Sequence, residues 1–253
     1  MDLNLKGKIA IVTGGGSGLG AAISELLVQE GATVVVNYIV DQSNVFKFVD
    51  SLNEKYNSNC IPLYGDITNA SDIDNIIARC VDIYGKVDIL VNNAGVWPTQ
   101  YVENMSDEEW EKTVRINLTG PFMFSKREVR HLIERKSPGK IINIVSQAAF
   151  HGSTSGHAHY ASAKGGLVTF TVSLAREVAK YGINVNAVAP GMMRTPMNKK
   201  ELAEREAEYL ERIPLRRISD PIEVAYTVAF LASDKADYIT GATIDVTGGM
   251  LMR

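Results

Sequence analysis

Short runs of β-branched residues alternate along this chain with longer segments that have helical spacing. In the first such unit, an apolar run at residues 8–13 precedes a glycine cluster and then Leu19, Ile23 and Leu26 at helical intervals. Six further runs are predicted as strands: 34–36, 61–63, 89–91, 141–145, 185–188 and 243–246. Most are apolar throughout, as expected of strands that helices cover on both faces. The alternation predicts an α/β fold, a Rossmann-type doubly wound parallel sheet of about seven strands.

The length of 253 residues and the apolar fraction of 45% are sufficient for one large hydrophobic core. No repeat or low-complexity linker divides the chain, so residues 1–253 are expected to form a single domain. The net charge of −3 and the scattered basic residues argue against nucleic acid as a partner. No apolar run is long enough to cross a bilayer, and the first residues do not resemble a signal peptide. A cytoplasmic protein without membrane contact is expected.

The glycine cluster after the first predicted strand has the spacing Gly-x-x-x-Gly-x-Gly through Gly14, Gly18 and Gly20. Where side chains are missing, backbone N–H groups can approach a pyrophosphate at the N-terminus of the next helix. The alternative interpretation is a tight turn without a ligand. Because the cluster lies between a predicted strand and a predicted helix, we favour a dinucleotide site.

The end of the second predicted strand normally indicates which dinucleotide is bound. An acidic residue there favours NAD through the ribose hydroxyl, and a cation favours NADP through the 2′-phosphate. This chain has Asn37 and Tyr38 at that position, with Asp41 further on. No Lys or Arg occurs between Lys8 and Lys47. The prediction is NAD or NADP, with a slight preference for NAD.

Tyr160 and Lys164 lie four residues apart in a segment that has helical spacing up to about Tyr181. Residues at this interval share one face of a helix, so the phenol and the ammonium point the same way. A neighbouring cation favours the phenolate form of tyrosine, which allows the pair to exchange a proton with a carbonyl or alcohol oxygen. The same spacing also occurs on ordinary solvated helix faces.

The order and spacing of further motifs extend this observation along the chain: Thr13–Gly20, Asp66–Thr68, Asn92–Gly95, Asn117, Ser146, Tyr160-x-x-x-Lys164, Pro190–Gly191 and Thr195. With these motifs the chain resembles the short-chain dehydrogenase/reductase family from about Leu5 to Met250. The resemblance implies a Rossmann-type fold, a nicotinamide cofactor and a homotetramer. It also implies that the protein is an enzyme that interconverts a secondary alcohol and a ketone.

The resemblance assigns four catalytic residues. Tyr160 would be the general acid and base on the reacting oxygen, and Ser146 would form a hydrogen bond with the same oxygen. Lys164 would bind the nicotinamide ribose and lower the pKa of the tyrosine. Asn117 would hold a water that connects Lys164 to solvent. Hydride transfer leaves charge on an oxygen, and such charge needs a proton donor and a second donor for orientation.

The resemblance also implies the contacts with the cofactor, which come from the segments after the strands and from the helix with Tyr160: Gly14, Ser17, Gly18, Leu19, Gly20, Tyr38, Asp66, Ile67, Asn93, Ala94, Gly95, Tyr160, Lys164, Pro190, Gly191, Met193 and Thr195. Asp66 would contact the adenine ring. The implied substrate contacts are Ser146, Gln147, His157 and Tyr160.

The C-terminal third is most similar to the bacterial 3-oxoacyl-[acyl-carrier-protein] reductase branch, which implies reduction of a 3-oxoacyl thioester. Arg130 and Arg176 lie where that branch docks its carrier protein. Ser17 replaces a basic residue that is common in the branch, and His159 replaces the Asn before the catalytic tyrosine, as in some sugar dehydrogenases. A sugar, polyol or other small-alcohol dehydrogenase is therefore the alternative. A non-catalytic dinucleotide-binding sensor is an alternative of another class.

Two further segments carry expectations about the substrate pocket. His151, His157 and His159 are expected to line the pocket or its rim, and no metal site is expected because the other ligands are missing. Residues 192–213 are expected to form a small lid over the active site. An amphipathic surface helix packed by an apolar stripe is the alternative for that segment.

Overall fold

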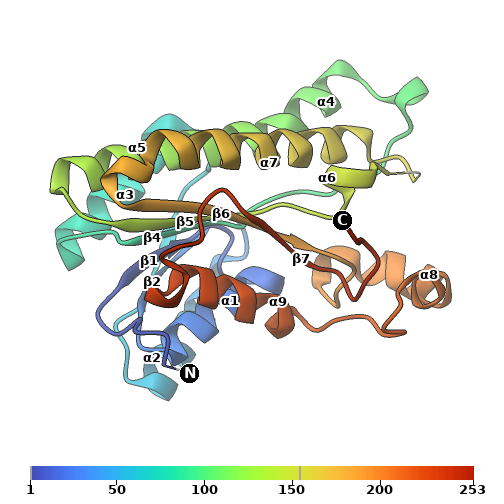
Figure 1. Ribbon diagram of the computed structural model, residues 1–253. Helices are drawn as coiled ribbons and strands as arrows, with labels where there is room; N and C mark the ends of the chain where they lie inside the picture. The colour runs from blue at the N-terminus through green and yellow to red at the C-terminus, as the bar shows by residue number, and fades with distance from the viewer. Residues whose placement is uncertain (1, 154) are drawn as a thin grey trace.

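The computed structural model describes residues 2–153 and 155–253, and these contain one seven-stranded parallel sheet with the order β3-β2-β1-β4-β5-β6-β7 (Figure 1). All six strand pairs are parallel, as continuous apolar strands require. The strands are β1 (Ile9–Val12), β2 (Thr33–Tyr38), β3 (Ile61–Tyr64), β4 (Ile89–Asn92), β5 (Gly139–Ile144), β6 (Ile183–Pro190) and β7 (Thr243–Val246). The predicted fold class is confirmed.

Helices cover both faces of the sheet (Figure 1). One face carries α1 (Gly18–Gln29), α2 (Gln42–Tyr56) and α9 (Pro221–Ala232). The other carries α3 (Ala70–Tyr84), α4 (Asp107–Val114), α5 (Gly120–Arg135) and α7 (Ala158–Val178). Two more helices, α6 (Ala148–His151) and α8 (Lys199–Arg212), lie beyond the carboxyl ends of the central strands. The candidate site is therefore at that end of the sheet.

The sheet separates two hydrophobic cores, one on each face, and side chains of β1 point alternately into the one and the other. Ala10 and Val12 belong to the buried cluster under α1 and α9, whereas Ile9 and Ile11 belong to the cluster under α3 and α5. Pro62 is compatible with strand structure because β3 is an edge strand, where one row of backbone groups needs no partner. Cys60 and Cys80 are both buried, as small core residues.

Element boundaries differ from the predicted ones by a few residues. The strand predicted at 185–188 extends over Ile183–Pro190, and the helix predicted from Tyr160 begins at Ala158. Asn117 lies in a π-helical segment, Arg115–Thr119, rather than in a regular helix. Within the described ranges, none of the helices combines the length and apolar character that crossing a membrane requires.

Candidate active site

The phenol of Tyr160 and the ammonium of Lys164 lie on one face of α7, close to Ser146 at the end of β5. The Ser146 side chain lies close enough to the Tyr160 hydroxyl to influence its pKa. Lys164 Nζ donates to the carbonyl oxygen of Ile144 at 2.7 Å and lies 5.8 Å from the centre of the Tyr160 ring. The end of β5 and α7 thus bring the hydroxyls of Ser146 and Tyr160 and the ammonium of Lys164 close together.

Burial controls the protonation of this group. It raises the pKa of Tyr160, although the neighbouring Ser146 side chain acts in the opposite direction. Burial also lowers the pKa of Lys164 to about 8. At neutral pH the protein on its own therefore holds a protonated phenol beside an ammonium. This arrangement can donate a proton to an oxygen that lies against Tyr160 and Ser146.

The side chain of Asn117 is buried and fixed next to Lys164. Its Nδ2 donates to the carbonyl oxygens of Val96 and Thr113, both at 3.0 Å, and its Oδ1 accepts from Val96 N–H at 3.3 Å. A Cβ on Gly95 would lie 2.7 Å from Asn117 Oδ1 and 3.7 Å from Lys164 Nζ. The absence of a side chain at Gly95 thus leaves a space between the amide and the ammonium. Single π-helical turns of this kind are frequent at functional sites.

The glycine turn between β1 and α1 fits the pyrophosphate of a dinucleotide. Gly14 and Gly18 have φ of +60° and +51°, and a Cβ on Gly14 would lie 3.2 Å from Ala94 Cα. A Cβ on Gly20 would collide with the carbonyl oxygen of Gly14. The Ser17 side chain makes no capping hydrogen bond with α1, so the first N–H groups of the helix have no side-chain partner there. Such a helix N-terminus favours a phosphate.

The end of β2 offers no cation to a 2′-phosphate. Tyr38 is buried and packs edge-to-face with Phe46 and Tyr64, with ring centres 6.1 and 5.9 Å apart. The amide of Asn37 donates to the carbonyl oxygens of Leu63 and Gly65. Both side chains at the end of β2 are therefore already engaged in contacts within the protein, and neither carries a positive charge.

The other implied cofactor residues lie after β3, β4 and β6, at the same end of the sheet. Asp66 accepts from Thr68 N–H at 2.7 Å, and Ile67 is buried beside Gly120. Asn93 Nδ2 donates to the carbonyl oxygen of Thr13 at 2.9 Å, so this side chain ties β4 to the glycine turn. The remaining residues lie at the end of β6 and in the segment after it: Pro190, Gly191, Met193 and Thr195.

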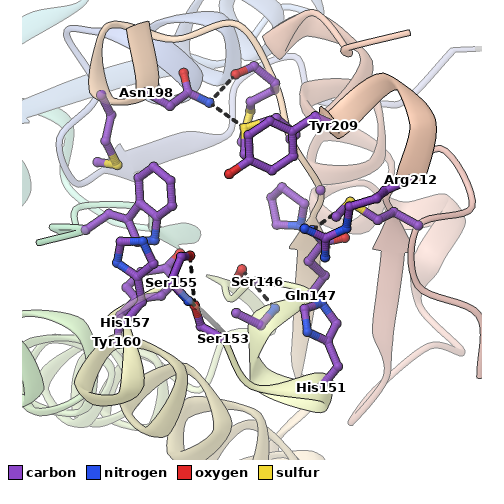
Figure 2. A pocket seen from close by; sticks show the side chains of 18 of the residues that line it. Ser146, Gln147, His151, Ser153, Ser155, His157, Tyr160, Asn198, Tyr209 and Arg212 are labelled. Carbon is purple, nitrogen blue, oxygen red and sulfur yellow. Dashed lines mark hydrogen bonds between the residues drawn. The ribbon is translucent and has the colours of Figure 1, made fainter. Parts of the chain in front are cut away.

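A cavity opens beside Ser146 and Tyr160 (Figure 2). His157 is stacked on Trp97, with ring centres 4.4 Å apart and an angle of 23° between the planes. Its Nδ1 lies 2.7 Å from the carbonyl oxygen of Pro98, and burial lowers the pKa of the imidazole. Other lining residues come from α6, from α8 and from the segments that follow β5, β6 and β7: Gln147, His151, Ser153, Ser155, Met192, Asn198, Tyr209, Arg212 and Met250.

The expectation that all three histidines line the pocket is wrong for His159. His151 and His157 line the cavity, but His159 is fully buried and does not. Successive residues of a helix point about 100° apart, so the residue before Tyr160 faces elsewhere. Sequence reasoning also missed Trp97 and Arg212, because nothing in their local sequence connects them to Tyr160.

The segment at 192–213 contains α8, which packs against the protein by an apolar stripe. Leu202, Tyr209 and Ile213 are buried and form a cluster with Ile218. The helix has a non-helical residue, Arg205, in its middle. In this state α8 is the amphipathic surface helix of the alternative interpretation, and it also forms one wall of the cavity. Among the residues that the structure describes, no group of His, Cys, Asp or Glu is arranged to hold a metal ion.

Comparison with known proteins gives full-length matches. Residues 14–251 match the family described as enoyl-(acyl carrier protein) reductase. The chain is 41% identical over 250 residues to a 3-oxoacyl-[acyl-carrier-protein] reductase from Vibrio cholerae and 39% identical over 250 residues to one from Escherichia coli, covering 99% of this chain and 100% of each relative. A crystal structure of a putative gluconate dehydrogenase from Agrobacterium tumefaciens has a TM-score of 0.94 and 35% identity, covering 100% of this chain and 99% of that chain.

Proposed function

Because the chain belongs to the short-chain dehydrogenase/reductase family and is an NAD(P)-dependent oxidoreductase that acts on hydroxyl and keto groups, we propose that Tyr160 is its general acid and base. The observation that carries this proposal is that Tyr160 and Ser146 line one cavity, with the buried ammonium of Lys164 5.8 Å from the Tyr160 ring. No other described part of the cavity wall combines these features.

In the direction of reduction, the substrate carbonyl oxygen lies against the two hydroxyls. Ser146 donates a hydrogen bond to it, and Tyr160 gives it a proton as charge develops. The nicotinamide, when bound, supplies the hydride to the carbonyl carbon. Lys164 stabilises the phenolate that remains, because its ammonium is 5.8 Å from the Tyr160 ring. In the oxidative direction the same groups remove the proton from the alcohol.

Asn117 has a positioning role in this proposal. Three hydrogen bonds with Val96 and Thr113 fix its amide, and its Oδ1 faces the space beside Gly95 and Lys164. A water held in that space would connect the Lys164 ammonium to solvent and return the proton after each turnover. Loss of the Asn117 amide is expected to lower the turnover rate, because the proton returns more slowly, and to have a smaller effect on the affinity for the cofactor.

The replacement Tyr160→Phe tests the proposed acid. It removes only the hydroxyl, so we expect turnover to fall by roughly 10²–10⁴-fold, while cofactor binding measured by fluorescence titration is retained. Tyr181→Phe, at an exposed position, is the matched control and is expected to keep full activity. Full activity of Tyr160→Phe would contradict the assignment. A wild-type protein that binds the cofactor but turns over no alcohol or ketone would favour a sensor.

We propose NAD as the preferred cofactor. Its phosphates would bind at the glycine turn and the start of α1, and its nicotinamide would lie against Tyr160, Lys164 and the segment from Pro190 to Thr195. The preference is supported by the absence of any Lys or Arg between Lys8 and Lys47 in the sequence. Initial rates with NADH and NADPH, compared at equal substrate concentration, test it.

The first substrate class is a 3-oxoacyl thioester. It is supported by similarity over the whole chain to 3-oxoacyl-[acyl-carrier-protein] reductases. Arg130 and Arg176 are exposed on α5 and α7, where a carrier protein would reach them. Acetoacetyl-CoA is the test ketone, and oxidation of the reduced cofactor is the readout. Turnover would support the thioester class.

The second class is a small polar alcohol, and the hydrogen-bonding groups of the cavity support it. Polar side chains such as Gln147, Ser153, Ser155 and His157 line the cavity beside apolar ones, and they offer partners to several hydroxyl groups. The likeness to a putative gluconate dehydrogenase adds support. Oxidation of sugars, polyols and sugar acids is the corresponding assay. Turnover in this assay without reduction of acetoacetyl-CoA would decide for the second class.

A further inference from the structure

Arg212, the last residue of α8, is an exposed cation that lines the cavity and has no hydrogen-bond partner among the described residues. Four other arginines in this part of the chain have hydrogen-bond partners, namely Arg194 with Glu206, Arg205 with Glu201 and Glu208, Arg216 with backbone carbonyls, and Arg217 with Glu223. Arg212 instead lines the cavity, and no described residue forms a hydrogen bond or ion pair with its guanidinium. Its five N–H donors are therefore available to a ligand.

Gln147 provides a second, independent indication of a polar ligand. Its side chain is only 8% exposed, and its Nε2 donates to Met250 Sδ at 3.2 Å. Its Oε1 is buried and has no partner among the described residues. A buried acceptor without a donor is costly, and a ligand hydroxyl would supply that donor. Figure 2 shows Arg212, Gln147 and His151 along one side of the cavity.

The charges around the cavity favour an anion. Among the described lining residues, Arg212 is the one permanently charged side chain, and no Asp or Glu is present. Glu208, a carboxylate of α8 close enough to interact with Arg212, is held by two hydrogen bonds from Arg205. A ligand carboxylate would therefore meet a guanidinium that is not hydrogen-bonded to a described residue, in a cavity whose described lining contains no carboxylate. Guanidinium and carboxylate match in geometry, with two parallel hydrogen bonds.

The opposite side of the cavity suits hydroxyl groups. His157 places its Nδ1 against the carbonyl oxygen of Pro98, which leaves Nε2 as an acceptor in the neutral ring. Ser153 and Ser155 line the same region. The cavity has a volume of about 180 Å³, which leaves room for a small polar molecule.

We propose that the substrate is a small hydroxycarboxylate whose carboxylate binds Arg212 and whose hydroxyl groups contact Gln147 and His157. This inference rests on the hydride-transfer function proposed above, and within that function it selects the second substrate class. Arg212 is then a specificity-determining residue that contacts the substrate away from the reacting oxygen. It discriminates a sugar acid from the neutral sugar alcohol of the same length.

The test is a binding measurement that requires no turnover. Gluconate and glucitol differ only in a carboxylate that replaces a hydroxymethyl group, so they form a matched pair. Both are already reduced, and neither reacts in the presence of saturating NADH. We expect calorimetry to show gluconate binding to the wild-type complex roughly tenfold or more tightly than glucitol. Arg212→Ala should abolish this preference, and Arg212→Lys should retain part of it because lysine keeps the charge without the planar fork.

Arg217→Ala is the control, because Arg217 is paired with Glu223 and does not line the cavity. It should keep the wild-type preference, and thermal melting should show that all variants are folded. The inference is overturned if wild type binds gluconate no better than glucitol, if neither binds, or if Arg212→Ala keeps the preference. In those cases turnover of acetoacetyl-CoA would leave the proposed function standing. Arg212-dependent binding of gluconate without turnover of any alcohol or ketone would instead contradict the proposed function.

Discussion

At the scale of single residues, the chemistry of the candidate site depends on how burial divides protons between Tyr160 and Lys164. An exposed tyrosine has a pKa near 10 and is a poor base at neutral pH. In this protein, burial raises the pKa of Tyr160 further, while it lowers the pKa of Lys164 to about 8. The protein without cofactor is thus prepared to donate a proton rather than to accept one.

The pKa of Lys164 predicts a pH dependence of the reductive reaction. Below about pH 8 the side chain is an ammonium, and as the pH rises through that value it loses its charge and its effect on the phenol. We expect kcat/KM for ketone reduction, which reports groups of the free enzyme, to decline above about pH 8. Lys164→Met should give a much slower enzyme that lacks this step. A wild-type profile that stays flat through the same range would contradict the prediction.

Ser17 predicts how cofactor preference can be changed. The residue is exposed in the glycine turn, beside the region where the adenosine end of the cofactor would lie. Ser17→Arg would add a guanidinium for the 2′-phosphate, so the KM for NADPH should fall by roughly tenfold or more, with little change for NADH. Ser17→Gln, similar in length but neutral, is the control. Equal effects of both replacements would rule out a charge-based explanation.

At the scale of elements, α5 carries a carboxyl group that the proposed mechanism does not use. Glu128 is fully buried, and neither of its carboxyl oxygens has a partner among the described residues. Burial raises the pKa of Glu128 to about 8, with a smaller contribution from Asp88 and an opposing one from Arg135. The side chain is therefore protonated in the folded protein at neutral pH.

This buried carboxyl group predicts that stability falls as pH rises. In the unfolded chain Glu128 loses its proton near pH 4.3, whereas in the folded protein it keeps the proton up to about pH 8. Between these values the folded state binds more protons, so the free energy of unfolding decreases with increasing pH. Glu128→Gln should flatten this decline in urea titrations, and Glu134→Gln, exposed on the same helix, should not. The same slope in wild type and Glu128→Gln would contradict the assignment.

A second contact at this scale connects the C-terminal residue, Arg253, with α6. The guanidinium of Arg253 lies 3.7 Å from the centre of the Phe150 ring and forms an ion pair with Asp245 at 2.9 Å. α6 begins two residues after Ser146 and includes His151, which lines the cavity. The C-terminal residue thus packs against the helix that forms one wall of the cavity, although it is more than one hundred positions away in the sequence.

At the scale of the whole molecule, the site lies where the order of the strands reverses. The chain builds β1, β2 and β3 outward in one direction and then crosses back to place β4 beside β1. The helices that follow β1 and β4 leave on opposite faces, and the crevice between them is where open α/β sheets bind ligands. The residues from the glycine turn to Thr195 meet there because all parallel strands end at the same edge.

We propose a homotetramer as the assembled molecule, since the resemblance to the family implies it. Light scattering coupled to size exclusion is expected to give four times the chain mass of 27.6 kDa. The measurement is best made at several protein concentrations, because assembly follows mass action. A mass equal to one chain at all concentrations would contradict the proposal.

The sequence alone was sufficient for the features that depend on local pattern. Apolar runs predicted the seven strands because a strand buried on both faces must be apolar throughout. The spacing of Tyr160 and Lys164 predicted a shared helix face, since helical geometry is independent of the rest of the chain. Boundaries were less accurate, as for the helix that begins at Ala158, because the ends of elements depend on tertiary contacts.

The tertiary structure decided which side chains meet across long distances in the sequence. Asn117 lies beside Gly95 and Lys164, and Arg212 lies above Gln147, only because the sheet and α8 bring these segments together. His159 shows the converse, since its neighbour in sequence lines the cavity while packing turns His159 into the core. Local pattern fixes periodicity and backbone conformation. Contacts between distant segments depend on how the elements pack, and only the folded chain determines that packing.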